Sequence, residues 1–204
     1  MVVSTPRRGR PRGFDRDAAL DRAIRLFWRQ GYQATSVRDL SQELGIGQPS
    51  LYAAFGDKRA LFEEAVRVYD GRYGGFIDAA LAEEPTAAGA MRRILAEAPA
   101  RYTRRGLPRG CLVAGGDAGT EDAEVRTWLG RFRAGKTRAL ARRIRADREA
   151  GLLPPGCDPA ALADYVMAVL TGLVQRARDG GTRRDLEAVA RIAATALPPL
   201  PDDP

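Results

Sequence analysis

The stretch TSVRDLSQELGIGQPSLYAAFGDK, residues 35–58, predicts two short helices joined by a tight turn. The first helix begins with a capping box, in which the Ser36 hydroxyl accepts from an amide three residues on and the Asp39 carboxylate reaches back. Leu40 and Leu44 continue the apolar face that opens at Val37, at helical spacing. The pattern therefore predicts a capped helix that is amphipathic and only about two turns long.

A turn and a second helix follow. Gly45 suits the left-handed conformation that ends a helix, and Pro49 suits the first helical position, where its missing N–H costs nothing. Along the second helix Leu51 and Phe55 face the core. The side chains left pointing outward are those of Gln48, Ser50, Tyr52 and Ala53. A helix-turn-helix places a second helix of this kind in the DNA major groove and reads base edges with its N-terminal residues.

This segment resembles the DNA-binding domain of the TetR family of transcriptional repressors. The resemblance covers about the first third of the chain, and its motif is specific enough to decide against two small helices that merely pack in a helical protein. It implies an all-α fold, with an N-terminal three-helix helix-turn-helix domain and a larger C-terminal helical domain for ligand binding and dimerisation. The residues that carry it are Gly31-Tyr32, Thr35–Leu40, Leu44–Ile46, Ser50–Tyr52, Phe55 and Lys58.

The resemblance also implies a function: a homodimeric repressor that binds a palindromic operator in double-stranded DNA and is released by a small-molecule effector. Gln48 can bond adenine bidentately, and Arg38 can bond guanine. Lys58 resembles the family's phosphate-contacting lysine. The predicted DNA contacts in this segment are Thr35, Ser36, Arg38, Gly47, Gln48, Pro49, Ser50, Tyr52 and Lys58, with Thr35, Tyr52 and Lys58 on phosphates.

Residues 1–14 form a basic segment without acidic residues, rich in proline and glycine, which predicts a flexible arm. Its centre, Arg8-Gly9-Arg10-Pro11-Arg12, looks like the core of an AT-hook. A narrow A·T-rich minor groove concentrates negative potential, and an extended arginine fits it. We therefore predict that Arg8, Arg10 and Arg12 reach the minor groove; a basic arm that touches phosphates alone is the alternative.

Composition excludes several classes of protein. The 204 residues carry a net charge of +7, a balance that favours attraction to phosphate. No apolar run approaches 18 residues and no apolar signal segment opens the chain, so we expect a cytoplasmic protein without a membrane span. The chain has no histidine and only two distant cysteines, so neither a metal site nor a disulfide framework is expected.

An enzyme is not expected, because the sequence contains no nucleophile elbow, phosphate loop or carboxylate pair at catalytic spacing, and no cofactor is predicted. Two alternatives within the same fold stay open. One is a transcriptional activator, and the other is an architectural DNA-binding protein that uses the basic arm without a ligand switch.

The expected organisation is an arm at residues 1–14, a helix-turn-helix domain at 15–57, a ligand-binding and dimerisation domain at 58–197 and a disordered tail at 198–204. The first helix spans residues 15–31. A long helix at 58–81 links the two domains, although glycines at 71, 74 and 75 each weaken it by roughly 1 kcal/mol. Further helices are expected at 86–104, 110–118, 121–149, 158–178 and 182–197.

The resemblance implies an effector cavity among the helices of the second domain. Aromatic residues at helical spacing are more often ordinary core, so core packing is the alternative for each candidate. Because few acidic residues interrupt these stripes, an apolar or aromatic effector is preferred. The candidate lining residues are Tyr69, Tyr73, Phe76, Met91, Leu95, Tyr102, Cys111, Trp128, Phe132 and Met167.

Cys111 has a second interpretation as a sensor. It follows an interruption between two predicted helices and lies near the start of the second, beside Arg109. A helix N-terminus and a nearby cation both lower the pKa of a thiol. The sequence around it also resembles a TetR-like branch that includes electrophile- and oxidant-sensing repressors. The alternative is a cysteine that acts as a small buried apolar group.

The last two expected helices are candidates for the dimer interface. Two helix pairs related by a two-fold axis make a four-helix interface, and in TetR-like proteins the two C-terminal helices form the dimer. The alternative is that both helices close the core of a single subunit. The predicted interface residues are Leu162, Tyr165, Val169, Leu173, Leu186, Val189 and Ile192.

Overall fold

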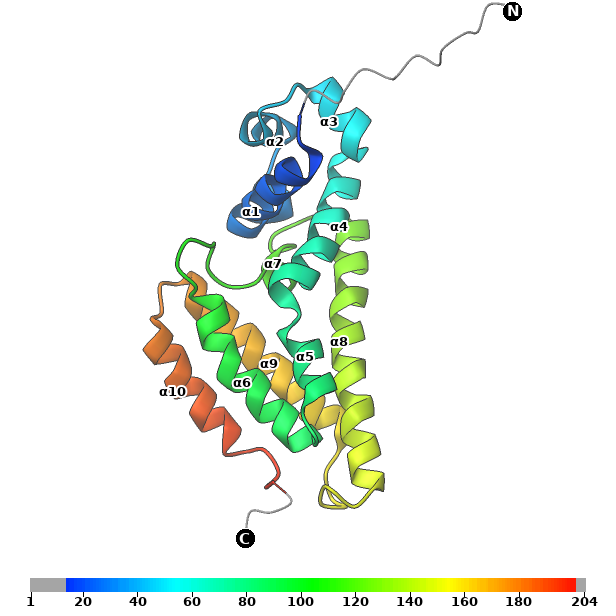
Figure 1. Cartoon of the computed structure of the whole chain (residues 1–204), viewed down its shortest axis with the longest axis vertical. Helices are drawn as coiled ribbons and strands as arrows, with labels where there is room; N and C mark the ends of the chain where they lie inside the picture. Colours follow the sequence, from blue (N-terminus) through cyan, green and yellow to red (C-terminus); the bar gives the residue numbers. More distant parts are fainter. Residues whose placement is uncertain (1–13, 201–204) are drawn as a thin grey trace, which may run out of the picture.

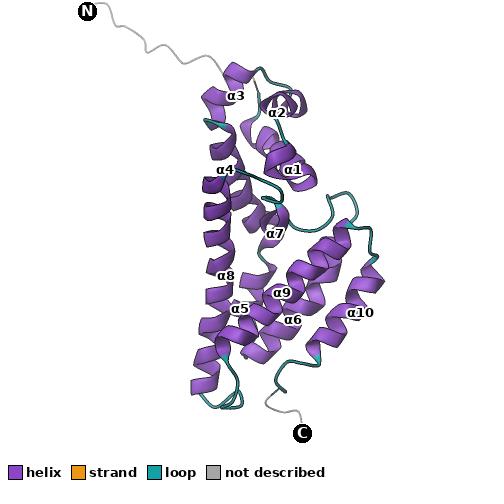
Figure 2. Ribbon diagram, turned by 180° about the vertical axis from the view of Figure 1, so that it is seen from behind, coloured by secondary structure: helices purple, strands orange, loops and turns teal. Residues whose placement is uncertain are grey.

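The computed structural model describes residues 14–200, and these residues form helices and connecting loops without a β-strand (Figures 1 and 2). The predicted all-α fold is confirmed. None of the helices in this part of the chain has the length and apolar character that crossing a membrane requires. The elements are α1 (Arg16–Ala34), α2 (Val37–Leu44), α3 (Gln48–Phe55), α4 (Lys58–Tyr69), the π-helical turn η1 (Asp70–Gly74), α5 (Phe76–Glu83), α6 (Ala87–Tyr102), α7 (Leu112–Gly115), α8 (Ala123–Glu149), α9 (Pro159–Arg178) and α10 (Arg183–Ala194).

Helices α1, α2 and α3 form one end of the molecule (Figure 1). The carboxylate of Asp15 caps α1 by accepting from the amides of Asp17 and Ala18. Gly31 interrupts the helix with a φ of 77°, a conformation that glycine adopts without steric cost. The first helix was predicted to end at this glycine; it kinks there instead and continues for one further turn to Ala34.

The helix-turn-helix forms as the sequence predicts. Ser36 and Asp39 make the reciprocal capping box of α2. Gly45 ends α2 in the left-handed conformation at φ 68°, and its amide donates back to the last turn of the helix. Gly47 caps α3, which begins at Gln48, so that Pro49 occupies the second helical position rather than the expected first.

The long helix predicted over residues 58–81 is interrupted. The Asp57 carboxylate caps α4 by accepting from the amide of Ala60, and α4 ends at Tyr69. A π-helical turn then carries the chain into α5. The interruption coincides with the three glycines, and a side chain at Gly74 would lie 2.9 Å from a carboxylate oxygen of Asp70. Gly74 thus permits a tight local packing against Asp70, beyond the bend that the sequence indicated.

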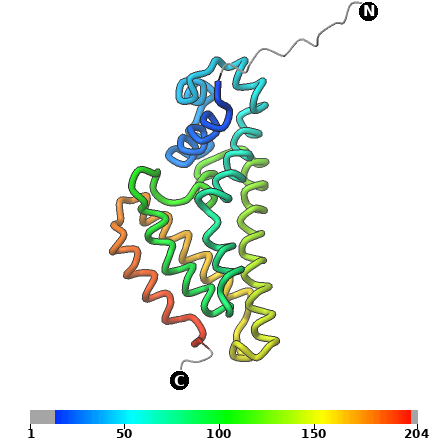
Figure 3. Tube along the Cα trace, viewed as in Figure 1, coloured from blue at the N-terminus to red at the C-terminus, as the bar shows by residue number. Residues whose placement is uncertain are grey.

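The remaining helices pack into a bundle. Helix α6 lies between α5, α9 and α10, and α9 also packs along α8 (Figure 3). Most predicted boundaries are correct within three residues. The helix expected at 110–118 shortens at both ends to the single turn of α7. Pro198, expected to open a disordered tail, is buried.

Two hydrophobic clusters organise these helices. One joins α1–α4 with Leu112 of α7 and with Val125 and Leu129 at the start of α8. The other joins α5, α6, α9 and α10 with the later part of α8, including Leu140 and Ile144. Helices α7 and α8 therefore connect the helix-turn-helix end of the molecule with the bundle. The division expected between residues 57 and 58 stays a prediction.

Candidate functional site

Helix α3 turns a polar side outward at one end of the molecule (Figure 1). Leu51 and Phe55 anchor the helix, with exposures of 0% and 5%. The predicted contact residues Gln48, Pro49, Ser50 and Tyr52 are all exposed, together with the capping residue Gly47. All of these residues are therefore accessible to DNA, and their contact with base edges stays a prediction.

Ser36 and Arg38, at the start of α2, are also exposed. The Ser36 hydroxyl donates to the Asp39 carboxylate at 2.7 Å and accepts from the Asp39 amide at 3.1 Å. The hydroxyl of Ser36, followed by its amide, holds the pKa of Asp39 below its usual range. Ser36 is thus occupied as a helix cap, whereas Arg38 extends beside it.

The predicted phosphate contact of Thr35 is corrected by the structure. Thr35 was expected to hold a phosphate, but its side chain is 0% exposed. Its hydroxyl donates to the carbonyl of Gly31 at 2.7 Å and so closes the kinked end of α1. The hydroxyl therefore serves the fold and does not lie on the surface with the other predicted contacts.

Lys58 lies half-buried at the first position of α4. Its ammonium nitrogen is 4.1 Å from the centroid of the Tyr32 ring. Burial lowers the pKa of Lys58, and the charges of Asp122 and Asp39 act against that effect. Neither Lys58 nor Arg38 belongs to any ion pair found among residues 14–200. Both cations are therefore free of carboxylate partners within the described chain, and the predicted minor-groove residues Arg8, Arg10 and Arg12 lie outside it.

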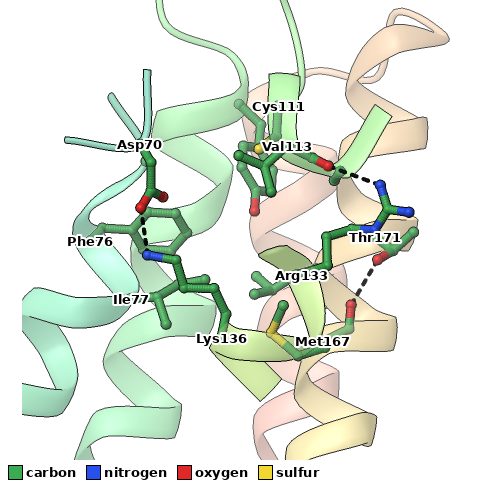
Figure 4. Close-up of a pocket in the computed structure, with 13 residues that line it drawn as sticks. Asp70, Phe76, Ile77, Cys111, Val113, Arg133, Lys136, Met167 and Thr171 are labelled. Carbon is green, nitrogen blue, oxygen red and sulfur yellow. Dashed lines mark hydrogen bonds and ion pairs between the residues drawn. The ribbon is translucent and has the colours of Figure 1, made fainter. Parts of the chain in front are cut away.

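A cavity lies inside the bundle, and Figure 4 shows the residues around it. Its volume is about 60 Å³, well below the roughly 300 to 1,000 Å³ of a typical small-molecule pocket. Four of the expected residues line it, namely Phe76, Tyr102, Cys111 and Met167. The full lining is Asp70, Gly74, Phe76, Ile77, Tyr102, Cys111, Val113, Ala114, Arg133, Lys136, Met167, Leu170 and Thr171.

Tyr69 and Tyr73 do not line this cavity. Their rings pack against Trp28 of α1, with centroid distances of 4.7 and 5.5 Å. The Tyr73 hydroxyl donates to Asp21, also in α1. The structure therefore corrects the ligand-binding expectation for both tyrosines, which join α4 and the following turn to the first helix.

Trp128 and Phe132 also lie outside the cavity. Both pack against the hydrophobic cluster of the helix-turn-helix end, and the Arg67 guanidinium of α4 lies 5.2 Å from the centroid of the Trp128 ring. Met91 and Leu95 are buried in the cluster of the bundle and are likewise absent from the cavity wall. Helical spacing identified these residues as apolar stripes but could not tell which of two cores each stripe faces.

Three charged residues of the cavity wall were missed: Asp70, Arg133 and Lys136. The Lys136 ammonium contacts the carboxylates of Asp70 at 2.7 Å and Asp78 at 2.5 Å. Burial acts to lower the pKa of Lys136, but the two carboxylates together raise it above the usual value. The only signal in the sequence is that Arg133 and Lys136 stand three positions apart, on one face of α8.

Arg133 is fixed as firmly as Lys136. Its guanidinium makes two hydrogen bonds of 2.9 Å to the Asp117 carboxylate and one of 3.2 Å to the carbonyl of Val113. Figure 4 shows it reaching toward the α7 segment, whereas Lys136 points toward Asp70. The cavity therefore combines an apolar wall, which suits the predicted apolar or aromatic effector, with cations that already have partners.

The thiol of Cys111 lies in the cavity wall, but the predicted activation is wrong. Arg109 donates to the carbonyls of Ala177 and Gly181, at the end of α9, and does not neighbour the thiol. Burial raises the pKa of Cys111, although hydrogen bonds from Tyr69 and from two backbone amides act against it. The geometry favours a protonated thiol at neutral pH.

The predicted dimer residues divide into two groups. Val189 and Ile192 of α10 are exposed, at 46% and 73%, without a partner of their own subunit covering them. Leu173 and Leu186 are each 1% exposed, so the structure corrects their assignment to an interface and places them in the core of the subunit. Leu162, Tyr165 and Val169 are partly buried against that core, and the Tyr165 hydroxyl donates to the carbonyl of Ala193.

Two family models match the chain. The family described as "Bacterial regulatory proteins, tetR family" matches residues 19–65, and "Tetracyclin repressor-like, C-terminal domain" matches residues 87–193. The first match contains α2 and α3, and the second contains most of the cavity wall. The two models together cover more than half of the chain.

Named relatives match over nearly the full length. The HTH-type transcriptional repressor ComR of Escherichia coli K12 is 34% identical over 193 residues, covering 93% of this chain and 90% of ComR. The repressor BdcR of the same strain is 31% identical, covering 93% of this chain and 92% of BdcR. A cysteine-substituted form of the TetR family regulator CifR, solved with a 26-base-pair operator duplex, has a TM-score of 0.87 and 40% identity, and the match covers 93% of this chain and 100% of the CifR chain.

Proposed function

The chain belongs to the TetR family of bacterial regulators and is a DNA-binding transcriptional repressor, and we propose that it works in the cytoplasm as a homodimer released from its operator by a small molecule. The observation that carries this proposal is the outward side of α3, where Gln48, Pro49, Ser50 and Tyr52 are exposed at one end of the molecule. A helix with its apolar side fully anchored and its polar side free can enter a major groove without unfolding any part of the subunit.

The proposed operator contacts follow from this surface. Arg38, Gln48 and Ser50 face base edges, where arginine and glutamine pair bidentately with guanine and adenine. Lys58 holds a phosphate, since its ammonium has no carboxylate partner within the described chain. The arm before α1 reaches the minor groove through Arg8, Arg10 and Arg12.

The proposed dimer face lies on α9 and α10. Val189 and Ile192 are apolar and exposed on α10. On α9 the exposed residues Ala161, Ala168 and Gly172 recur at intervals of seven and four positions, so they share one helical face. Small residues let two helices approach closely, and a two-fold axis through this face would bury the exposed apolar side chains of both subunits.

The proposed effector occupies the cavity of the bundle. Its apolar part would contact Phe76, Tyr102 and Met167, and a polar group would lie near Lys136. Since the present cavity of about 60 Å³ is much smaller than a typical small-molecule pocket of roughly 300 to 1,000 Å³, a drug-sized effector would displace the wall. We propose that this displacement is the switch, because it would shift the position of the helix-turn-helix end relative to the cavity.

The dimer is tested with an Ile192→Asp variant. A charge at this exposed position should leave the subunit folded, because the side chain has little contact with its own core, but it would be buried in the dimer. We expect a monomer at micromolar concentration in sedimentation velocity, native helicity by circular dichroism and a loss of operator affinity. Leu152→Asp, in the exposed loop after α8, is the matched control and should remain dimeric. A dimeric Ile192→Asp protein would contradict the proposed face.

The effector cavity is tested by filling it. Met167→Trp places a larger side chain into the proposed site, so compounds that raise the unfolding temperature of the wild type should lose that effect in the variant. Binding that survives the substitution unchanged would place the effector elsewhere.

A further inference from the structure

Tyr32 lies where the helix-turn-helix end meets the segments that line the cavity. Its side chain is 8% exposed, and its ring packs against Phe62 and Phe27 at centroid distances of 5.1 and 6.5 Å. Its hydroxyl donates to the Asp122 carboxylate at 3.2 Å, and its amide donates to the carbonyl of Gly116 at 2.7 Å. The position of the ring is thus fixed by packing and by one hydrogen bond at each end of the residue.

The face of this ring holds the ammonium of Lys58, 4.1 Å from the centroid. An aromatic face attracts a cation and restricts the flexible chain that carries it. Restriction before binding lowers the entropy that must be lost when a ligand is bound. The ring therefore presents Lys58, the first residue of α4, in one place and leaves its charge without an ion-pair partner in the described chain.

Two segments connect Tyr32 to the cavity. Gly116, which accepts from its amide, directly follows α7, and α7 contributes Val113 and Ala114 to the cavity wall. Asp122 accepts from the Tyr32 hydroxyl with one oxygen and caps α8 with the other, by accepting from the first two amides that follow Ala123. Helix α8 carries Arg133 and Lys136 into the cavity (Figure 4). A shift of either wall segment therefore reaches Tyr32 through a single hydrogen bond.

We propose that Tyr32 is a positioning residue for the phosphate contact: its ring sets Lys58 for the operator backbone, and its hydroxyl makes that setting depend on the cavity through α8. This inference rests on the proposed role of Lys58. Tyr32 would touch neither the DNA nor the effector, yet it would help to couple effector binding to operator binding.

The salt dependence of operator binding tests the positioning. Each phosphate contact contributes about 0.9 to the slope of the logarithm of the binding constant against the logarithm of salt concentration. Lys58→Gln should lower the slope by about that amount for each bound subunit, and Tyr32→Leu should lower it equally. The double variant should lower it no further, because both changes remove the same contact. Tyr32→Phe keeps the ring and should keep the wild-type slope.

Gln48→Ala is the matched control for these measurements. It removes a proposed base contact, so it should weaken binding without changing the slope, and its effect should add to that of Tyr32→Leu. If Lys58→Gln leaves the slope unchanged, both the phosphate role of Lys58 and this inference fall. If Lys58→Gln lowers the slope but a folded Tyr32→Leu protein keeps it, the inference alone falls.

The two lysines of the chain, Lys58 and Lys136, allow a second measurement that does not depend on how Tyr32→Leu folds. Lysine-selective ¹³C labelling gives two sets of side-chain signals: those of Lys58, beside the ring of Tyr32, and those of Lys136, in the cavity wall. We expect a ring-current shift of the Lys58 signals in the free wild-type protein. Absence of that shift would overturn the positioning.

Addition of the operator duplex should then move the signals of both lysines, because coupling between two sites is reciprocal. In Tyr32→Phe, which lacks the hydrogen bond to Asp122, the Lys58 response should persist and the Lys136 response should fall by at least half. Lys136 signals that ignore the operator in the wild type, or that respond equally in Tyr32→Phe, would overturn the link to the cavity.

Discussion

The helix-turn-helix end of the molecule, which we call the recognition end, and the cavity in the bundle both contain cations. The two regions differ in whether these cations have carboxylate partners. Arg38 and Lys58 take part in no ion pair among the described residues, whereas Arg133 and Lys136 each contact carboxylates at 2.9 Å or less. An unpaired cation can bind a phosphate without first losing a protein partner. A paired cation holds its own helices together, so a ligand must compete with the protein for it.

The difference separates two tasks. In the proposed function, Arg38 and Lys58 contribute to binding DNA, and without an ion pair in the described chain they should contribute little to the stability of the fold. In the cavity Lys136 joins α8 to the π-helical turn and to α5, and Arg133 joins α8 to the α7 segment. Charge in the cavity is therefore structural until a ligand displaces it, and this suits a site whose occupation should move helices.

The two lysines should differ most clearly in what their loss costs the stability of the fold. Lys136→Met leaves the Asp70 carboxylate without its cation in a mostly buried place, so the free energy of unfolding should fall by about 2 to 3 kcal/mol. Lys58→Met should change it by less than about 1 kcal/mol. Urea unfolding of the two variants measures both values. Equal losses of stability would show that the two sites do not differ as described.

The next effect concerns the recognition surface. Tyr52→Ala removes an exposed side chain of α3 and should weaken operator binding by about tenfold, or about 1.4 kcal/mol, with an unchanged unfolding temperature. Leu152→Ala, with a similarly exposed side chain in the loop after α8, should leave operator binding unchanged. Fluorescence anisotropy with a labelled duplex gives both affinities. A Tyr52→Ala protein that binds normally would exclude this residue from the interface.

A smaller effect compares two capping boxes of the same design. Ser36 with Asp39 caps α2, and Thr182 with Asp185 caps α10. Replacement of either hydroxyl residue by alanine should cost about 1 kcal/mol of stability. Operator affinity should fall only for Ser36→Ala, because that cap fixes the helix next to the recognition helix. An equal loss of operator affinity in Thr182→Ala would show that the cap of α2 matters no more for DNA binding than the cap of α10.

The smallest effect is a shift in a pH profile. Because burial raises the pKa of Cys111 above its ordinary value of 9.0, the thiolate fraction should still be increasing at that pH. The rate of alkylation by iodoacetamide in a Cys157→Ser background should therefore keep rising through pH 9. A plateau below pH 8 would instead indicate an activated thiol and would restore the hypothesis that Cys111 is a sensor. That hypothesis would then be tested by adding oxidant, which should release the operator from the wild type but not from Cys111→Ser.

Much of the recognition end could be predicted because its signals are local. A capping box and the left-handed Gly45 each depend on a few consecutive residues, and they set the helix ends found in the structure. The partners of Trp128 and Tyr69 depend instead on which of two cores each helix face meets. The partners of Arg109 lie 68 and 72 positions away in sequence. No local pattern contains that information, so the cavity wall was only partly predicted.

Lys136 shows the same limit from the other side. Its two carboxylate partners are separated from it by 66 and 58 positions, and they lie in the π-helical turn and in α5. The sequence indicated a weakness at the glycines there but not that Asp70 would turn toward α8. The site that couples charge to helix position is thus a product of tertiary packing.

In the proposed function, a two-fold dimer presents α3 twice to the bases of one operator. Hydroxyl-radical footprinting on the DNA that flanks the protein's own coding sequence tests it most directly. We predict two protected half-sites related by two-fold symmetry, with centres separated by about one helical turn or a multiple of it, and loss of both in Tyr52→Ala. A single asymmetric protected stretch, or a footprint that the α3 substitution leaves intact, would contradict it.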